Sequence, residues 1–192
     1  MKIDIQDGKN VFLISDIHFG HSNIVKYDSR PFFNDFGEPD LGLMHKTILQ
    51  NWNSVVKKND VVFYLGDLYF SNNGIKEYVH RLNGQIHYIL GNHDNAKDIA
   101  KLERFATIND YLEVNIIDKA KSNLHFILMH YPILSWNRKH RGSFMVHGHE
   151  HMNFSDGEFH KNNRIIDVGC NGWNYTPVSY EEIVKRLENI KY

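Results

Sequence analysis

The most constraining feature of this sequence is a pattern that occurs five times: a short apolar run followed at once by Asp, Asn or His. Such runs are typical of strands buried on both faces. In α/β proteins, functional groups gather where loops leave the carboxyl ends of such strands. The pattern therefore predicts an α/β fold with one site, built from these endings: Asp16 with His18, Asp67, Asn92 with His93, His130, and His149 with His151.

Composition indicates the number of domains and limits the classes of partner that the protein is expected to bind. The chain has 192 residues, of which 42% are apolar, enough for one well-filled core. We therefore expect a single domain over residues 1–192. The formal net charge of -1 gives no overall basic footprint, so extended nucleic-acid binding is not expected. A bound metal pair would add positive charge that this sum omits, so a nucleic-acid substrate is not excluded.

Cysteine usage and hydropathy bear on the compartment. Cys170 is the only cysteine, which excludes an intrachain disulfide and a cysteine-rich metal site. Residues 1–10 are polar and lack the apolar core of a signal peptide. No stretch approaches the roughly 18 consecutive apolar residues of a membrane span. We therefore expect a soluble, cytoplasmic protein with no membrane partner.

Periodicity and turn residues predict the elements that would carry this site. Residues 19–40 are rich in Gly, Asn, Asp and Pro and are predicted to form a long loop, which is often functional. Ser179 and Glu182 predict a capped C-terminal helix. The other predicted helices are 43–56, 75–82 and 98–105. Strands are predicted at 11–14, 61–65, 86–90, 108–117, 124–129, 144–146 and 164–169, with a hairpin turn at 118–123.

The residue types in the predicted site suit metal ions. In extended backbone, Asp16 and His18 point the same way and could hold one ion together. Two carboxylates against two divalent ions leave a charge of about +2, which suits an anionic phosphoester plus hydroxide. Imidazole ligands favour manganese, iron, zinc, nickel or cobalt over magnesium or calcium. The pattern therefore predicts two divalent transition metal ions, without selecting among these metals.

The order of the motifs resembles the calcineurin-like metallophosphoesterase superfamily, in particular its small microbial and phage members. The matching elements are Asp16-Ile17-His18, Gly66-Asp67, Gly91-Asn92-His93-Asp94, His130 and Gly148-His149-Glu150-His151. The resemblance implies a four-layer αββα sandwich, with two mixed β-sheets flanked by helices. It also implies binuclear metal binding, with manganese as the expected ion.

The same resemblance implies a role for each residue. Asp16, His18, Asp67 and His151 would hold the first metal; Asp67 would bridge to a second, completed by Asn92, His130 and His149. A metal-bound hydroxide would attack phosphorus in line, and His93 would protonate the leaving oxygen. The expected protein is thus a hydrolase, a di-metal phosphodiesterase acting on a small, possibly nucleotide-like phosphoester.

One departure from the family pattern affects the substrate. The protein-phosphatase branch has a further Asp after the bridging Asp, whereas this chain has Gly66-Asp67-Leu68-Tyr69-Phe70. That difference favours phosphodiesters or small metabolites over phosphoproteins. A metal-dependent nuclease, a phosphomonoesterase and a non-catalytic scaffold of the same fold stay as alternatives, although a scaffold would be expected to lack part of this ligand set.

Six further side chains are candidates for contacts with the substrate, because they are polar or aromatic and lie in predicted loops. Arg30 is the clearest, since a guanidinium can hold a phosphate bidentately. Packing or solvent exposure would explain each of them equally well. The candidates are His21, Asn23, Arg30, Trp136, Arg141 and Trp173.

Overall fold

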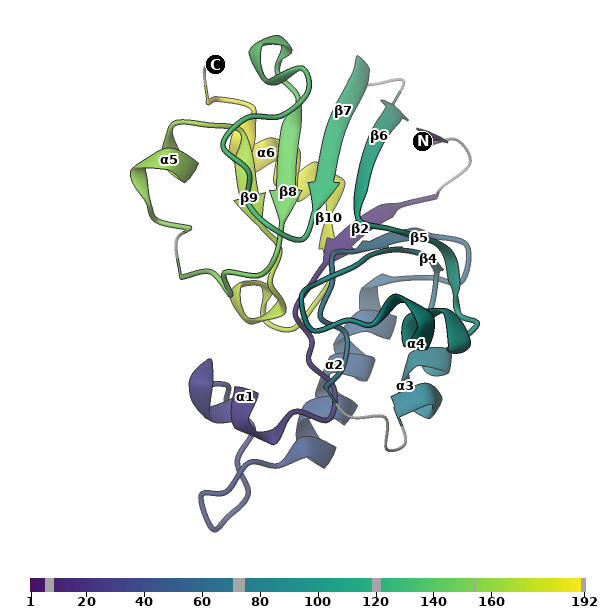
Figure 1. Cartoon of the computed structure of the whole chain (residues 1–192), viewed down its shortest axis with the longest axis vertical. Coiled ribbons are helices and arrows are strands. Elements are labelled where there is room, and N and C mark those ends of the chain that lie inside the picture. Colours follow the sequence, from purple (N-terminus) through teal and green to yellow (C-terminus); the bar gives the residue numbers. More distant parts are fainter. Residues whose placement is uncertain (6–8, 71–74, 119–121, 154, 191–192) are drawn as a thin grey trace.

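Two mixed β-sheets of five strands each form the centre of the protein (Figure 1). The computed structural model describes residues 1–5, 9–70, 75–118, 122–153 and 155–190. The first sheet has the order β10-β2-β3-β4-β5 and is parallel except for β10. Its strands are β10 (Val178–Ser179), β2 (Val11–Ile14), β3 (Val61–Tyr64), β4 (Gln85–Ile89) and β5 (Phe105–Asn109).

The second sheet has the order β1-β6-β7-β8-β9, and only its β6–β7 pair is antiparallel. Its strands are β1 (Lys2–Asp4), β6 (Tyr111–Asp118), β7 (Ser122–Met129), β8 (Phe144–His147) and β9 (Ile165–Asp167). The helices are α1 (Ser22–Tyr27), α2 (Leu41–Val55), α3 (Ile75–Arg81), α4 (Ala96–Lys101), α5 (Glu158–Lys161) and α6 (Tyr180–Leu187), with short 3-10 turns η1 (Lys139–Arg141) and η2 (Cys170–Trp173).

The core between the sheets is made by alternate residues of their strands. Leu13 and Phe63 of the first sheet share one buried cluster with Phe126 and Val146 of the second. Successive side chains on a strand point to opposite faces, so the intervening residues pack outward. The two facing layers bury this apolar surface from water, which is the main favourable contribution to folding.

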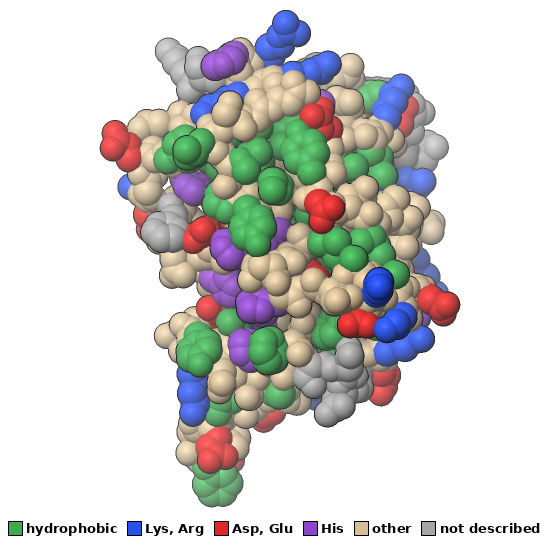
Figure 2. Space-filling view, in the orientation of Figure 1, with side chains coloured by type: hydrophobic (Ala, Val, Ile, Leu, Met, Phe, Trp, Pro, Cys, Tyr) green, Lys and Arg blue, Asp and Glu red, His purple; other side chains and the backbone are tan. Residues whose placement is uncertain are grey.

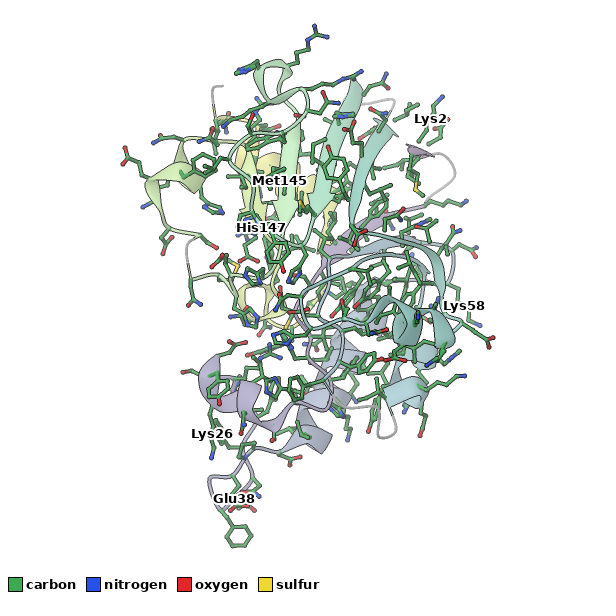
Figure 3. The ribbon with its side chains drawn as sticks, viewed as in Figure 1. Lys2, Lys26, Glu38, Lys58, Met145 and His147 are labelled. Atoms are coloured by element: carbon green, nitrogen blue, oxygen red, sulfur yellow. The ribbon has the colours of Figure 1, made fainter. Side chains whose placement is uncertain are left out.

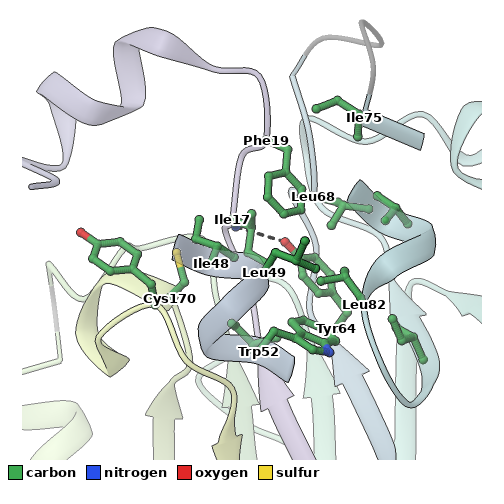
Figure 4. Packing of buried hydrophobic residues seen from close by; sticks show 14 of the residues in the cluster. Ile17, Phe19, Ile48, Leu49, Trp52, Tyr64, Leu68, Ile75, Leu82 and Cys170 are labelled. Atoms are coloured by element: carbon green, nitrogen blue, oxygen red, sulfur yellow. Dashed lines mark hydrogen bonds between the residues drawn. The ribbon is translucent and has the colours of Figure 1, made fainter. Parts of the chain in front are cut away.

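The outer face of the first sheet is covered by α2, α3 and α4, as Figure 1 shows. Trp52 of α2 is fully buried there beside Tyr64 of β3. Figure 4 shows the same cluster, in which the Ile17 backbone N–H donates to the Tyr64 hydroxyl at 3.1 Å. The outer face of the second sheet carries a smaller cluster of Ile127, Trp136, Met145 and Ile165. The predicted sandwich of two mixed sheets with helices is confirmed.

Three local predictions needed correction. Residues 108–117, predicted as one strand, belong to β5 and β6, which lie in different sheets. The predicted helix 98–105 is α4, which ends at Lys101, and Phe105 begins β5. The predicted loop 19–40 contains α1, whose N-cap His21 makes no side-chain capping hydrogen bond and so gives no sequence signal. Tertiary pairing overrides local apolar periodicity in each strand case.

The remaining elements agree with prediction to within a few residues. Ser179 caps α6, its side chain accepting a hydrogen bond from the Glu182 backbone N–H. Asp118 of β6 pairs antiparallel with Ser122 of β7, as a hairpin requires. The hairpin turn itself, at 119–121, lies outside the described residues. Among the described helices, none is both long and apolar enough to cross a membrane.

Candidate metal centre

The predicted ligands come together where strands of both sheets end. Asp16 follows β2 and Asp67 follows β3 in one sheet, while His130 follows β7 and His149 follows β8 in the other. Figure 2 shows histidines gathered on this face of the molecule, and Figure 3 labels His147 at the end of β8 nearest to them. Both sheets therefore contribute to one site through their carboxyl-terminal edges.

The first cluster joins Asp16, His18 and His151, whose side chains could hold one ion. The His18 and His151 Nε2 atoms lie 3.3 Å apart. Asp16 Oδ1 lies 4.0 Å from His18 Nε2 and 3.5 Å from His151 Nε2. Two imidazole nitrogens and a carboxylate oxygen thus face the same point, as in a transition-metal site.

The second cluster surrounds Asp67 and His130. Asp67 Oδ2 lies 3.5 Å from His130 Nε2 and 3.8 Å from His18 Nε2, so the carboxylate lies between the two clusters. Asn92 Oδ1 lies 2.9 Å from His130 Nε2 and 2.8 Å from His149 Nδ1. Asp16 also reaches this second group. The position of Asp67 suits a bridging ligand.

Several predicted ligands have a backbone conformation that residues other than glycine rarely adopt. The φ angle is positive at five predicted ligands: Asp16 (58°), His18 (54°), Asp67 (58°), His149 (69°) and His151 (49°). Such residues cluster at functional sites, where the surrounding structure enforces the conformation.

Two glycines permit the close approach of these strand ends. A Cβ at Gly91 would overlap the Asp67 carboxylate, and a Cβ at Gly148 would overlap Ser15 and the Asp16 carboxylate. Glycine is required at both positions because any side chain there would displace a predicted ligand.

Burial controls the charge of the cluster. It raises the pKa of the Asp16 carboxyl to about 7, although the neighbouring His151 acts in the opposite direction. Burial and the nearby His151 hold the pKa of His18 far below its ordinary value, which keeps the imidazole in the neutral form that binds metal. Asp16 Oδ1 is buried without a hydrogen-bond partner. A buried carboxylate oxygen facing two imidazole nitrogens fits a cation, which would supply the missing interaction.

His93, like Asn92, is exposed to solvent. Its backbone N–H donates to Asp67 Oδ1 at 2.9 Å, and its exposed ring lies 5.5 Å from the His18 ring. The neighbouring Asp94 does not serve as its partner. Asp94 Oδ2 instead accepts from the backbone N–H groups of Asp67 and Gly91 and from the Tyr88 hydroxyl. Asp94 thus fixes the loops that carry Asp67 and Asn92.

Arg30 does not contact the substrate side of the site, which corrects the prediction made from its loop position. Its side chain is fully buried and donates to the Asp16 and Ile17 carbonyl oxygens, both at 2.8 Å. It also forms an ion pair of 2.8 Å with Asp28 Oδ2. The same oxygen accepts from His151 Nδ1 at 2.7 Å. Arg30 therefore positions two predicted ligands, Asp16 directly and His151 through Asp28.

The carboxylate of Asp28 is ionised despite its surroundings. Burial opposes ionisation, but the hydrogen bond from His151 and the charge of Arg30 hold the pKa of Asp28 below its ordinary value. A carboxylate that accepts the second ring N–H of a metal-binding histidine fixes its tautomer and orientation. No sequence pattern distinguishes Asp28 from the other aspartates of the predicted loop.

Three other predicted substrate contacts are placed elsewhere. Trp136 is buried in the outer cluster of the second sheet. Arg141 lines a hollow with Asn123 near the beginnings of β7 and β8, the opposite strand ends from the predicted ligands. Trp173 packs on the inter-sheet core, with the Arg186 guanidinium 4.0 Å from its ring centroid. The predictions for Trp136 and Arg141 are wrong because an aromatic or basic loop residue can serve packing equally well, whereas a substrate contact of the half-buried Trp173 stays a prediction.

Two predicted contacts lie nearer the site. The His21 ring lies 5.8 Å from the His18 ring, so His21 borders the first cluster. Asn23 is exposed on α1, close to His21 in sequence. His147 and Cys170 are buried: His147 Nδ1 lies 2.8 Å from the Gly148 carbonyl oxygen, and Cys170 Sγ donates to the Asp16 carbonyl oxygen.

Fold and cluster together define an α/β sandwich protein with an Asp/His-rich centre at the edge shared by its two sheets. No family model matches the chain. The uncharacterized protein MJ1445 of Methanocaldococcus jannaschii is 38% identical over 188 residues, covering 95% of this chain and 94% of its own. The chain therefore belongs to the same family as MJ1445.

Two more distant proteins also match over nearly the whole length of both chains. The gene 66 protein of Mycobacterium phage L5 is 28% identical over 94% of this chain and 95% of its own. The crystal structure of the protein of unknown function AQ665 from Aquifex aeolicus superposes with a TM-score of 0.70 and 26% identity, covering 93% of this chain and all of that one. The sandwich is thus also the fold of a crystallised protein.

Proposed function

We propose that this protein is a metallophosphoesterase of the calcineurin-like superfamily, a hydrolase that uses two divalent transition metal ions to cleave small phosphodiesters. One observation carries the proposal: Asp, Asn and His side chains from five strand ends converge within hydrogen-bonding or ligand distance of one another. Manganese is the expected ion, and iron, zinc, nickel or cobalt suit the same ligands.

The ligands divide into two groups that share Asp67. Asp16, His18 and His151 would hold the first ion, and Asn92, His130 and His149 the second. When bound, the ions would withdraw charge from the phosphoryl oxygens and make water acidic enough to attack phosphorus. Asp67 suits the bridging position because its Oδ2 lies between His18 and His130.

The protein's own contribution to the reaction is orientation and proton transfer. His93 is exposed at the edge of the first cluster, where it would donate a proton to the leaving oxygen. Its backbone bond to Asp67 fixes its distance from the ligands. The carboxylate of Asp94 is engaged with backbone groups and Tyr88, so His93 would act without the Asp partner of the protein-phosphatase branch. This favours small diesters over phosphoproteins.

The test compares hydrolysis of bis-p-nitrophenyl phosphate with that of p-nitrophenyl phosphate, with added manganese, nickel, zinc or magnesium. Metal-dependent diester cleavage that Asp67→Asn abolishes is expected. Asp98→Asn is the matched control, because Asp98 is partly exposed on α4 and its carboxylate pairs with Lys101. Preference for the monoester would redirect the proposal to phosphomonoesters. Absence of both bound metal and turnover would refute it.

A further inference from the structure

An aromatic surface beside His93 has no role in metal binding. Phe70 is 57% exposed, and one face of its ring stacks on His21, with centroids 4.2 Å apart and an angle of 14° between planes. Its centroid lies 6.0 Å from that of His93. Because His21 covers one face and more than half of the side chain is accessible, the other face of Phe70 is open to solvent.

The position of this ring is fixed by backbone pairing rather than by its own side chain. Phe19 and Tyr69 form a parallel bridge, and the Phe70 N–H donates to the Phe19 carbonyl oxygen at 2.9 Å. His21 lies two residues after Phe19, so the same pairing places both stacked rings. Tyr27, 74% exposed, adds a third aromatic ring 6.3 Å from that of His21. Backbone pairing within the protein therefore fixes the position of this aromatic surface.

The side of the site on which Phe70 lies determines what it can contact. A general acid must lie next to the leaving oxygen, so His93 marks the direction in which the leaving group extends from phosphorus. The Phe70 ring borders the His93 ring, so a leaving group that extends past His93 reaches it. A planar ring in the leaving group would find an open aromatic face there, and a nucleobase stacks on such a face regardless of its identity.

We infer that Phe70, supported by His21, is a stacking surface for the nucleobase of a nucleotide leaving group, an inference that rests on the proposed function. The substrate class is then nucleotide phosphodiesters rather than ring-free metabolites. Stacking of one base on an exposed aromatic ring corresponds to a gain of about tenfold to a hundredfold in affinity. Because the contact is to the face of the ring, little discrimination among bases is expected.

The experiment measures equilibrium binding of AMP and ribose 5-phosphate to the manganese-loaded protein by calorimetry, with released phosphate assayed in the same samples. The two ligands share the phosphate and sugar and differ in the base. Wild type is expected to bind AMP at least about tenfold more tightly. Phe70→Ala should reduce AMP affinity to that of ribose 5-phosphate and leave the latter unchanged, whereas Phe70→Trp should retain the preference.

Phe36→Ala is the matched control, since Phe36 is 91% exposed and lies in the turn that also carries Glu38, far from the site in Figure 3. It should change neither affinity. Equal affinity of wild type for both ligands, or a Phe70→Ala change that weakens both alike, overturns the stacking inference.

Hydrolysis of bis-p-nitrophenyl phosphate by the same preparations separates the two proposals. Base-dependent binding without turnover would support the stacking surface and a binding role in place of the hydrolase function. Turnover with base-independent binding would support the hydrolase function and refute the stacking surface.

Discussion

Replacing Arg30 by methionine tests whether this residue supports the metal centre from within. The guanidinium is fully buried and makes hydrogen bonds to Asp28 and to the Asp16 and Ile17 carbonyl oxygens. Methionine would fill much of the same volume but would leave the Ile17 carbonyl oxygen without its donor, the Asp16 carbonyl oxygen with only the Cys170 thiol, and Asp28 without its cation. Each unsatisfied buried group costs about 1–3 kcal/mol, and breaking a buried ion pair costs about 3–5 kcal/mol.

Because His151 would remain bonded to Asp28, we expect Arg30→Met to lower the free energy of unfolding by about 3–5 kcal/mol rather than by the full sum. Guanidinium denaturation of the metal-free protein, followed by circular dichroism, measures this loss. Arg30→Lys should cost less, because it keeps the charge and loses the planar fork. Arg81→Met is the control: Arg81 is 57% exposed and pairs with Glu77 on α3, so about 0.5 kcal/mol or less is expected.

The opposite pattern would refute this reasoning. If Arg30→Met left the free energy of unfolding within about 1 kcal/mol of wild type and mainly raised KM for a phosphodiester, Arg30 would contact substrate, as its loop position alone suggested. Loss of stability together with weaker metal binding would support the positioning role through Asp28 and His151.

Two further predictions concern the site itself. His93→Gln should lower kcat for a diester by about 100-fold to 10,000-fold without changing the metal content measured by elemental analysis, and the exposed His140→Gln should alter neither; loss of metal in His93→Gln would make His93 a ligand instead. Metal affinity should rise from pH 6 to pH 8. Burial raises the pKa of Asp16 to about 7. Burial alone would lower the pKa of His151, but its hydrogen bond to Asp28 raises this pKa above the ordinary value. Both groups must lose a proton before binding, so calorimetry in buffers of different ionisation enthalpy should detect proton release at pH 6.5 that disappears near pH 8.5, and a pH-independent affinity would contradict this assignment.

The sequence alone determined the strands that carry the cluster and the residue types at their ends. Continuous apolar runs such as Val61–Tyr64 are buried on both faces, and this requirement is legible in the residues themselves. Glycines before Asp67 and before Asn92 marked the places where the backbone must approach closely, and the structure places each against the other's loop. The α6 cap at Ser179 was equally readable, because capping is a local interaction.

Only the tertiary structure decided which residues support the predicted ligands. Asp28 and Arg30 are ordinary loop residues in the sequence, and their role depends on His151, more than one hundred residues away in the chain. Trp136 and Arg141 carry the same side-chain chemistry as a substrate contact, yet the first packs in a cluster on the outer face of a sheet and the second lies at its opposite end. Local sequence fixes what a side chain can do, whereas its neighbours, set by long-range pairing of strands, decide which of those interactions is made.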